Sequence, residues 1–197
     1  MRKAAICILT AALMTACGST HAKRYFEIRT VASAEPALPK IERRLLVEAP
    51  SVDPLYDDIR ILYRVSPFEL KYYPYEFWAE KPGKQVGAAM AEYFGKTKVF
   101  PAVSRDPRME GPEIVLKSRV HVIEEIDNPD VWQARLAMDF EFVDVKSGKP
   151  LVSWTFDRKG QMGKSVGDLP AVVSRILDEE LGKAVWELAR TLEKKAS

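Results

Sequence analysis

Few residue types in this chain could do chemistry, and their spacing does not suggest a catalytic site. The 197 residues include two cysteines and two histidines. His21 lies among small and polar residues, and His121 falls on the polar side of an alternating strand, where a solvent-facing side chain is more common than a metal ligand. The carboxylate pairs Glu124–Glu125 and Glu179–Glu180 are expected on solvated faces. The sequence therefore predicts no enzymatic activity, no metal site and no cofactor.

The two cysteines lie in an N-terminal segment with the composition of an export signal. Two basic residues near its start are followed by an apolar stretch, residues 4–14, and then by small residues. At about 1.5 Å per residue this stretch is too short to cross about 30 Å of hydrocarbon as a helix, and no later segment contains about 20 apolar residues. We therefore expect residues 1–16 to be a signal peptide and the chain to have no transmembrane helix.

The end of this segment, Met14-Thr15-Ala16-Cys17, resembles the lipobox of bacterial lipoproteins. The resemblance implies a diacylglyceryl group on the Cys17 thiol, cleavage before Cys17, and a fatty acyl chain such as palmitate on the new amino group. Leu is more common than Met14 at its position, and an ordinary signal peptide with an incidental cysteine is the alternative. Gly18 stands where an aspartate usually signals retention in the inner membrane, so the resemblance implies the periplasmic face of the outer membrane.

Charge and cysteine content also favour anchoring by acyl chains. The formal net charge is +2, from 30 basic and 28 acidic residues. Removing residues 1–16 takes away Arg2 and Lys3, so the mature chain has 28 basic and 28 acidic residues and no net charge. Such a chain lacks the basic balance of a nucleic-acid-binding protein and cannot be held on anionic lipid by net charge, whereas two or three acyl chains bind a membrane durably. With Cys7 removed and Cys17 acylated, no free thiol remains.

Behind the anchor, residues 17–40 mix small and polar residues with two prolines and are expected to form a tether. Residues 41–197 are expected to form a single domain, since 47% of the whole chain is hydrophobic. Alternation or apolar runs predict strands over 43–48, 59–65, 68–75, 99–103, 113–126, 131–145 and 151–158, and helical spacing predicts helices over 82–95 and from 168 onward. The result is an α+β domain, a mostly antiparallel sheet with two helices packed on one face.

Alternation also predicts which side chains of the long strands face the helices. In the strand over 113–126, one side carries Ile114, Leu116, Val120 and Val122, and the other carries Lys117, Arg119, His121 and Glu125. In the next strand, the apolar side runs from Trp132 through Phe142. We therefore expect His121 and Glu125 on the open, polar face of the sheet.

Five aromatic residues occupy seven positions just ahead of the first helix. Phe77 and Trp78 are expected to anchor that helix against the sheet, with Trp78 in the core. Tyr72, Tyr73 and Tyr75 cannot all point inward from an extended segment, because neighbouring side chains alternate between faces. We therefore expect at least one tyrosine to be exposed and available to a partner, and we expect Tyr73 to be dispensable for folding.

The order of these features resembles a family, the auxiliary lipoproteins of ABC-type lipid transport, which accompany Mce-domain intermembrane systems such as Pqi and relatives of Mla. The resemblance rests on RYFEI at 24–28 after the anchor, on IRILYR at 59–64, and on FWAEKP at 77–82 ahead of a helix. It covers most of the mature chain. The stretch over 50–59 keeps only part of the family pattern, which indicates a divergent branch.

The resemblance makes Arg64, Trp78 and Glu80 signature residues and implies a role without catalysis. An outer-membrane-anchored domain would dock with a tunnel-forming Mce-domain protein whose base is an inner-membrane ABC permease and ATPase, and lipid would pass between the membranes. Some relatives form rings, so a homo-oligomeric ring is compatible with this reading. The alternative is a stand-alone periplasmic lipid- or glycan-binding lipoprotein, which would need a concave apolar pocket of a few hundred Å³.

Overall fold

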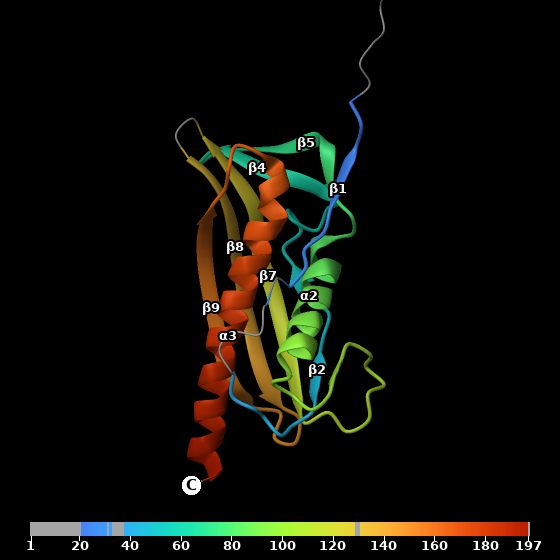
Figure 1. Ribbon diagram of the computed structural model, residues 1–197, viewed down its shortest axis with the longest axis vertical. Coiled ribbons are helices and arrows are strands. Elements are labelled where there is room, and N and C mark those ends of the chain that lie inside the picture. Colours follow the sequence, from blue (N-terminus) through green and yellow to red (C-terminus); the bar gives the residue numbers. More distant parts are fainter. Residues whose placement is uncertain (1–20, 31, 33–37, 129–130, 197) are drawn as a thin grey trace, which may run out of the picture.

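The fold is built on three long strands that form an antiparallel meander. A computed structural model describes residues 21–30, 32, 38–128 and 131–196. β7 (Ile114–Asn128), β8 (Val131–Asp144) and β9 (Pro150–Gln161) pair along nearly their whole lengths. A short 3-10 turn, η2 (Val166–Asp168), then leads into α3 (Leu169–Ala196), which runs along one face of the meander (Figure 1).

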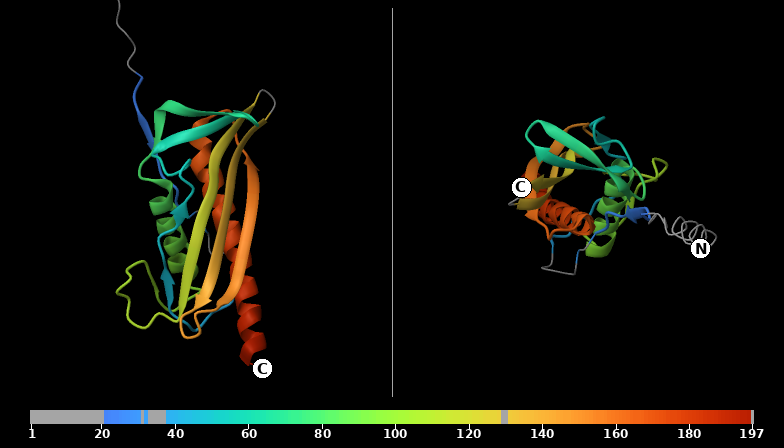
Figure 2. Two further views of the ribbon diagram at one scale, coloured as in Figure 1. Left: turned by 180° about the vertical axis from the view of Figure 1, so that it is seen from behind. Right: turned by 90° about the horizontal axis from the view of Figure 1, so that it is seen from above.

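A hairpin lies across one end of the long strands. It consists of β4 (Arg60–Ser66) and β5 (Glu69–Trp78), and β5 leads to α2 (Pro82–Thr97) (Figures 1 and 2). β1 (Arg24–Phe26) pairs in parallel with the last residues of β5, so the N-terminal segment joins the domain at the same end. We call residues 21–26 and 55–78 together the hairpin end.

The sheet is mixed: the long ladders are antiparallel, as expected, but several short pairs are parallel. β2 (Leu45–Val47), β3 (Ser51–Val52) and β4 pair in parallel, one after another, with a single edge of β7. β6 (Val103–Ser104) extends β2, also in parallel, and completes nine strands. The helical crossover through α2 returns the chain to the far end before β7 begins, and such a crossover produces parallel pairs. Alternation assigns faces but not the direction of pairing.

The core lies between the sheet and the two helices, which cover the same face (Figure 1). The ring of Phe94 in α2 meets those of Phe100 and Phe142 edge-on, with centroids 5.3 and 6.3 Å apart. The apolar stripe that helical spacing predicts for α3 is buried; its members include Val173, Leu177, Leu181, Ala184 and Leu188. Packing of both helices on one face is therefore as predicted.

A β-bulge at His121 reverses the predicted faces in the last part of β7. Val120 pairs with Met138 and Val122 pairs with the adjacent Ala137, so one extra residue is inserted in β7. Beyond the bulge, Glu125 pairs with the core-facing Ala134 and is itself fully buried. The expectation that Glu125 lies on the open face with His121 is therefore wrong, because the alternation shifts by one residue.

The N-terminal part of the expected tether belongs to the folded domain. Besides the pairing of β1 with β5, Ile28 and Thr30 are only 3% and 5% exposed. The hydroxyl of Thr30 donates to Oδ2 of Asp178 in α3 at 2.9 Å. The run of small and polar residues in this region therefore does not mark the domain boundary. None of the helices in the described ranges is long and apolar enough to cross a membrane.

Replacement of Trp78 tests the anchoring of α2. Its side chain is 2% exposed, so Trp78→Ala should lower the free energy of unfolding by about 3–5 kcal/mol, through lost burial and the cavity that remains. The matched control is Trp186→Ala, because Trp186 is 45% exposed; it should cost less than about 1 kcal/mol. Urea unfolding followed by circular dichroism measures both, and equal losses in the two variants would contradict the placement of Trp78.

Candidate functional site

The corner between β5 and α2 contains two of the three signature residues and joins three parts of the chain. Trp78 is buried, as predicted, and its backbone N–H donates to the carbonyl oxygen of Ile59 at 2.6 Å. The next N–H, that of Ala79, donates to the carbonyl of Phe26 in β1 at 2.8 Å. Pro82 is the first residue of α2, where its missing N–H costs no helical hydrogen bond.

Gln85 connects this corner to the N-terminal segment, and sequence reasoning missed it. Its side chain is 6% exposed. Oε1 accepts the N–H of Ile28 at 2.7 Å, and Nε2 donates to the carbonyl of Glu80 at 2.7 Å. A buried amide needs such partners, and here they fix the N-terminal segment to the first turn of α2. A sign of this role that is visible in the sequence is the presence of one polar residue, Gln85, beside the apolar stripe of the helix.

The signature residue Glu80 contributes to this corner mainly through its backbone. Its carbonyl oxygen is the acceptor for Gln85, whereas its carboxylate is half-exposed and pairs with Lys84 one turn along the helix. Exposed pairs of this kind contribute little to stability. The acidic side chain of Glu80 therefore remains available to solvent.

The third signature residue, Arg64, binds a fully buried carboxylate on the face opposite the helices. Nε and Nη2 of Arg64 donate to the two oxygens of Glu124 at 2.7 and 2.9 Å. The Tyr56 hydroxyl donates to Oε2 at 2.8 Å, and Nη1 of Arg135 lies 3.4 Å from Oε1. Glu124 is 0% exposed, which corrects the expectation of a solvated carboxylate pair at 124–125. The bidentate contact compensates its desolvation and fixes β4 to β7.

Glu125 is the second buried carboxylate of this pair and lies on the core side. The Tyr73 hydroxyl donates to Oε1 at 2.9 Å, while Oε2 has no hydrogen-bond partner among the described residues. Burial raises the pKa of Glu125 to about 7; the bond from Tyr73 opposes this rise, and the charges of Asp127 and Glu76 add to it. Because Glu125 is 0% exposed, a substrate cannot reach it, and we assign it a structural role.

The three tyrosines that the sequence proposes for a partner interface differ in their surroundings. Tyr73 is half-buried between Glu125 and the ring of Tyr63, at a centroid distance of 4.5 Å, and the expectation that it is dispensable for folding stays a prediction. The guanidinium of Arg60 lies 4.0 Å from the ring centroid of Tyr72. Tyr75 is 40% exposed, and its ring stacks on that of His21 at 5.1 Å. Tyr75 is therefore the most exposed of the three tyrosines.

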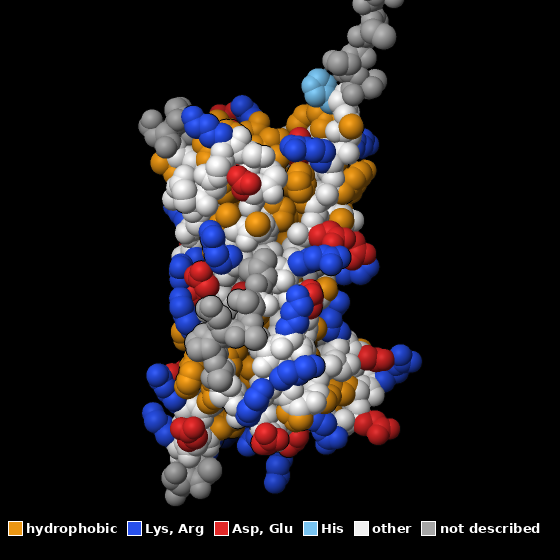
Figure 3. Space-filling model, in the orientation of Figure 1, with side chains coloured by type: hydrophobic (Ala, Val, Ile, Leu, Met, Phe, Trp, Pro, Cys, Tyr) orange, Lys and Arg blue, Asp and Glu red, His pale blue; other side chains and the backbone are white. Residues whose placement is uncertain are grey.

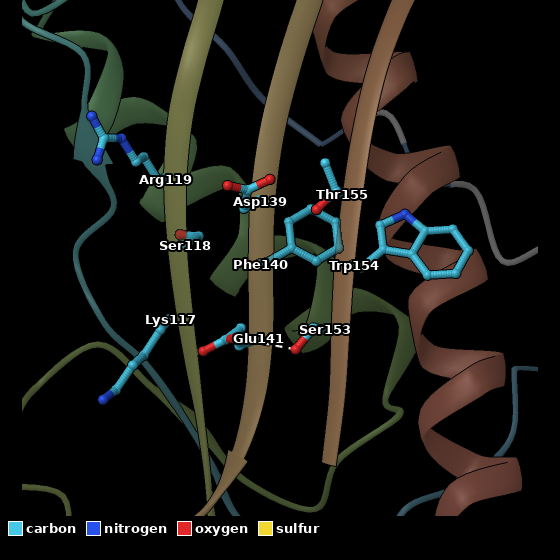
Figure 4. A pocket seen from close by; sticks show the side chains of 9 residues that line it. All are labelled: Lys117, Ser118, Arg119, Asp139, Phe140, Glu141, Ser153, Trp154 and Thr155. Carbon is cyan, nitrogen blue, oxygen red and sulfur yellow. Dashed lines mark hydrogen bonds between the residues drawn. The ribbon is translucent and has the colours of Figure 1, made fainter. Parts of the chain in front are cut away.

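The open face of the meander contains a shallow polar groove of about 350 Å³ (Figure 4). Two rows of side chains cross the three strands there: Lys117, Glu141 and Ser153, and next to them Arg119, Asp139 and Thr155. Trp154 points away from the groove, and its Nε1 donates to Glu180 in α3 at 3.0 Å. Glu180 is 3% exposed, so the expectation that both Glu179 and Glu180 are solvated is wrong for Glu180.

His121 lies at the edge of this groove, half-buried in the bulge. Its Nε2 is 2.5 Å from Oδ2 of Asp139, and its Nδ1 is 3.6 Å from Asp53, which also pairs with Arg119. The expected solvent-facing histidine is thus held between two carboxylates. Within the described ranges, no group of three or more potential ligands could hold a metal ion.

One known protein family matches most of this chain. The model of one family, described as the ABC-type transport auxiliary lipoprotein component, matches residues 26–182. This range begins within β1 and ends within α3, so it includes the corner, the hairpin and the meander. The chain belongs to this family. No curated protein matches the chain in sequence.

Two crystal structures show the same fold as this auxiliary lipoprotein. A DUF330 protein from Xanthomonas campestris is 19% identical, with a TM-score of 0.75, over 88% of this chain and 100% of that one. An uncharacterized protein is 15% identical, with a TM-score of 0.62, over 87% of this chain and 99% of that one. At such identities the likeness concerns the fold alone.

Of the three signature residues, Trp78 and Glu80 lie at the corner between β5 and α2, and Arg64 lies in the neighbouring strand β4. Tyr72, Tyr73 and Tyr75 lie on the adjoining β5. The proposed lipid-attachment residue, Cys17, lies outside the described residues.

The buried carboxyl of Glu125 predicts a specific pH dependence of stability in this auxiliary lipoprotein. Its pKa is higher in the folded than in the unfolded state, so folding retains a proton that the unfolded chain releases at lower pH. The free energy of unfolding of the wild type, relative to Glu125→Gln, should therefore fall as pH rises from about 4.5 to about 7, by on the order of 3 kcal/mol.

Urea titrations at a series of pH values measure this difference. Glu141→Gln, on the open face, controls for the loss of one carboxylate and should keep the pH dependence of the wild type. Parallel curves for the wild type and Glu125→Gln between pH 4.5 and 7 would show that Glu125 does not titrate in this way.

Proposed function

We propose that this auxiliary lipoprotein is anchored to the periplasmic face of the outer membrane by acyl chains on Cys17. We further propose that it serves as a non-catalytic docking component of an Mce-type ABC system that moves lipid between the membranes. The observation that carries the proposal is the family match over residues 26–182. Met14-Thr15-Ala16-Cys17 supports the anchor, and Gly18 supports the outer membrane.

In this proposal the partner is a tunnel-forming Mce-domain protein, linked at its base to an inner-membrane ABC permease and its ATPase. The end of such a tunnel must come close to the outer membrane. The hairpin end is the part of the domain nearest the anchor, because His21, four residues after Cys17, stacks there on Tyr75. Tyr75 is therefore the first candidate for contact with the tunnel, and Tyr72 the second. Several copies in a ring would surround the end of the tunnel symmetrically.

The described residues support a role without catalysis. The charged side chains with the deepest burial, Glu124 and Glu125, hold strands together and are closed to solvent. On the open face, carboxylates and cations form pairs with one another, as Asp157 does with Arg135. We find no reason in this arrangement to assign a nucleophile or a general base.

A stand-alone lipid- or glycan-binding lipoprotein is the weaker candidate. Such a module would need a concave apolar pocket. The groove on the open face is instead shallow and lined by charged and hydroxyl-bearing side chains (Figure 4). Purification of the protein with a stoichiometric bound lipid, and without a protein partner, would favour this alternative.

Replacement of Cys17 tests the proposal in cells. Cys17→Ala should move the protein out of the outer-membrane fraction and abolish its contribution to the permeability barrier, whereas Cys7→Ser, in the signal peptide, should change neither. Fractionation with immunoblotting measures location, and sensitivity to large antibiotics measures the barrier. Cross-linked wild-type cells should yield an Mce-domain protein on affinity purification. A Cys17→Ala protein that stays in the outer membrane, or purification without an Mce-domain protein, would contradict the proposal.

A further inference from the structure

The position of the N-terminal segment fixes which end of the domain can meet the membrane. The stacking of His21 on Tyr75 holds this segment at the hairpin end. Four residue steps separate Cys17 from His21, and an extended chain spans at most about 3.6 Å per residue, or about 14 Å in total. The 15 residues of β7 span about 50 Å. If Cys17 carries the acyl chains, as the proposed function states, the hairpin end lies against the membrane and the opposite end does not.

The exposed apolar side chains of the described domain are concentrated at this end. Among the described residues, seven large hydrophobic side chains are exposed, and five belong to the hairpin end: Tyr25, Leu55, Ile59, Phe68 and Tyr75. Tyr25 pairs with Phe77, close to Tyr75, and the carbonyl of Leu55 accepts the Tyr72 hydroxyl, whereas Phe68 lies in the turn that precedes the first residue of β5. Figure 3 shows hydrophobic surface near the point where the N-terminal segment leaves the domain, with charged side chains of both signs beside it.

Phe68 is the most exposed member of this group. It lies in the turn between β4 and β5, next to Pro67, and its side chain is 99% exposed. Its backbone N–H donates to the Ser66 hydroxyl at 3.3 Å, which orders the turn without covering the ring. Single exposed hydrophobic residues are common, but a bare aromatic ring at the apex of a hairpin that lies across the end of the domain where the N-terminal segment leaves suits interfacial insertion.

A basic pocket lies directly beside this turn. Its volume is about 640 Å³, and its lining includes Pro67 and the cations Arg64, Arg135 and Lys159. The carboxylate shared by the two arginines, Glu124, is fully buried beneath them, and Asp157 pairs with Arg135 from the side. The guanidinium nitrogens of both arginines already donate to Glu124, Asp157 and the carbonyl of Pro67, so Lys159 supplies the ammonium group that suits the phosphodiester of a lipid headgroup.

We propose that the hairpin end is a membrane-contact surface. Phe68 enters the boundary between headgroups and acyl chains, Tyr75 lies at the headgroup surface, open to the proposed tunnel partner, and the basic pocket binds the phosphate of a phospholipid in the same leaflet. The bound lipid surface and the acyl chains on Cys17 together set the orientation of the domain. The mature chain has no net charge, so this contact depends on local side chains and not on overall attraction.

The sequence allows a direct test, because Cys17 is acylated in the mature lipoprotein and leaves any introduced cysteine as the single reactive thiol. Full-length Phe68→Cys and Val145→Cys lipoproteins are labelled with an environment-sensitive fluorophore and reconstituted into phosphatidylethanolamine–phosphatidylglycerol vesicles. Val145 is the matched control, since it is 45% exposed and lies in the β8–β9 turn at the opposite end. Spin-labelled lipids should quench the label at position 68 at least fivefold more strongly than the label at 145. Equal quenching would overturn the inference.

Two further comparisons separate the roles of the ring and the pocket. With the label at Tyr75→Cys, Phe68→Ser should reduce quenching at least twofold, and Phe68→Trp should preserve it. With the label at position 68, Lys159→Glu should weaken quenching at least twofold, whereas Lys117→Glu, at the far end of the same face, should not. No effect of Phe68→Ser overturns insertion of the ring, and no effect of Lys159→Glu overturns the phosphate assignment.

Failure of this inference differs from failure of the proposed function. Flotation with vesicles measures anchoring through Cys17 independently of the label. A lipoprotein that floats but keeps position 68 in water contradicts the membrane-contact surface alone. A lipoprotein that inserts position 68 but yields no Mce-domain partner contradicts the docking role alone.

Discussion

The attachment of the N-terminal segment to the corner between β5 and α2 is the constraint on which the rest of the account depends. Gln85 is the central residue, because its buried amide binds the backbone at Ile28 and at Glu80. A buried amide without these partners would be costly, so the segment is held where the sheet, the hairpin and α2 meet. This local chemistry places residues 21–26 at one defined end of an elongated domain (Figure 1).

The bulge at His121 has a comparable effect on the hairpin. One inserted residue turns Glu124 to the open face and Glu125 to the core, and both are closed to solvent. Two buried carboxylates would destabilise the domain if they lacked partners. Arg64 in β4 and Tyr73 in β5 supply those partners by binding Glu124 and Glu125. These contacts hold both strands of the hairpin to β7, across the ends of the long strands. The contacts of Arg64 with Glu124 and of Trp78 with Ile59 thus hold this end of the domain together.

Much of the architecture could be predicted from the sequence, because periodicity reports burial directly. The long strands, both helices and the burial of Trp78 follow from alternation, helical spacing and the aromatic run. The bulge could not be predicted, since inserting one residue leaves the local pattern almost unchanged while exchanging the faces beyond it. The parallel pairing of short strands with β7 depends on contacts between distant segments. Gln85 and Phe68 were missed for the same reason: their burial or exposure depends on chain segments far away in sequence.

The central claim is that the hairpin end faces the outer membrane and meets the end of a lipid-transport tunnel there. Photo-crosslinking in living cells tests this most directly, with a photoreactive amino acid at Tyr75 or, as the control, at Val145 on the opposite end of the domain. The account predicts an adduct with an Mce-domain protein from position 75 and none from position 145. An adduct from position 145 alone, or from neither position, would contradict it.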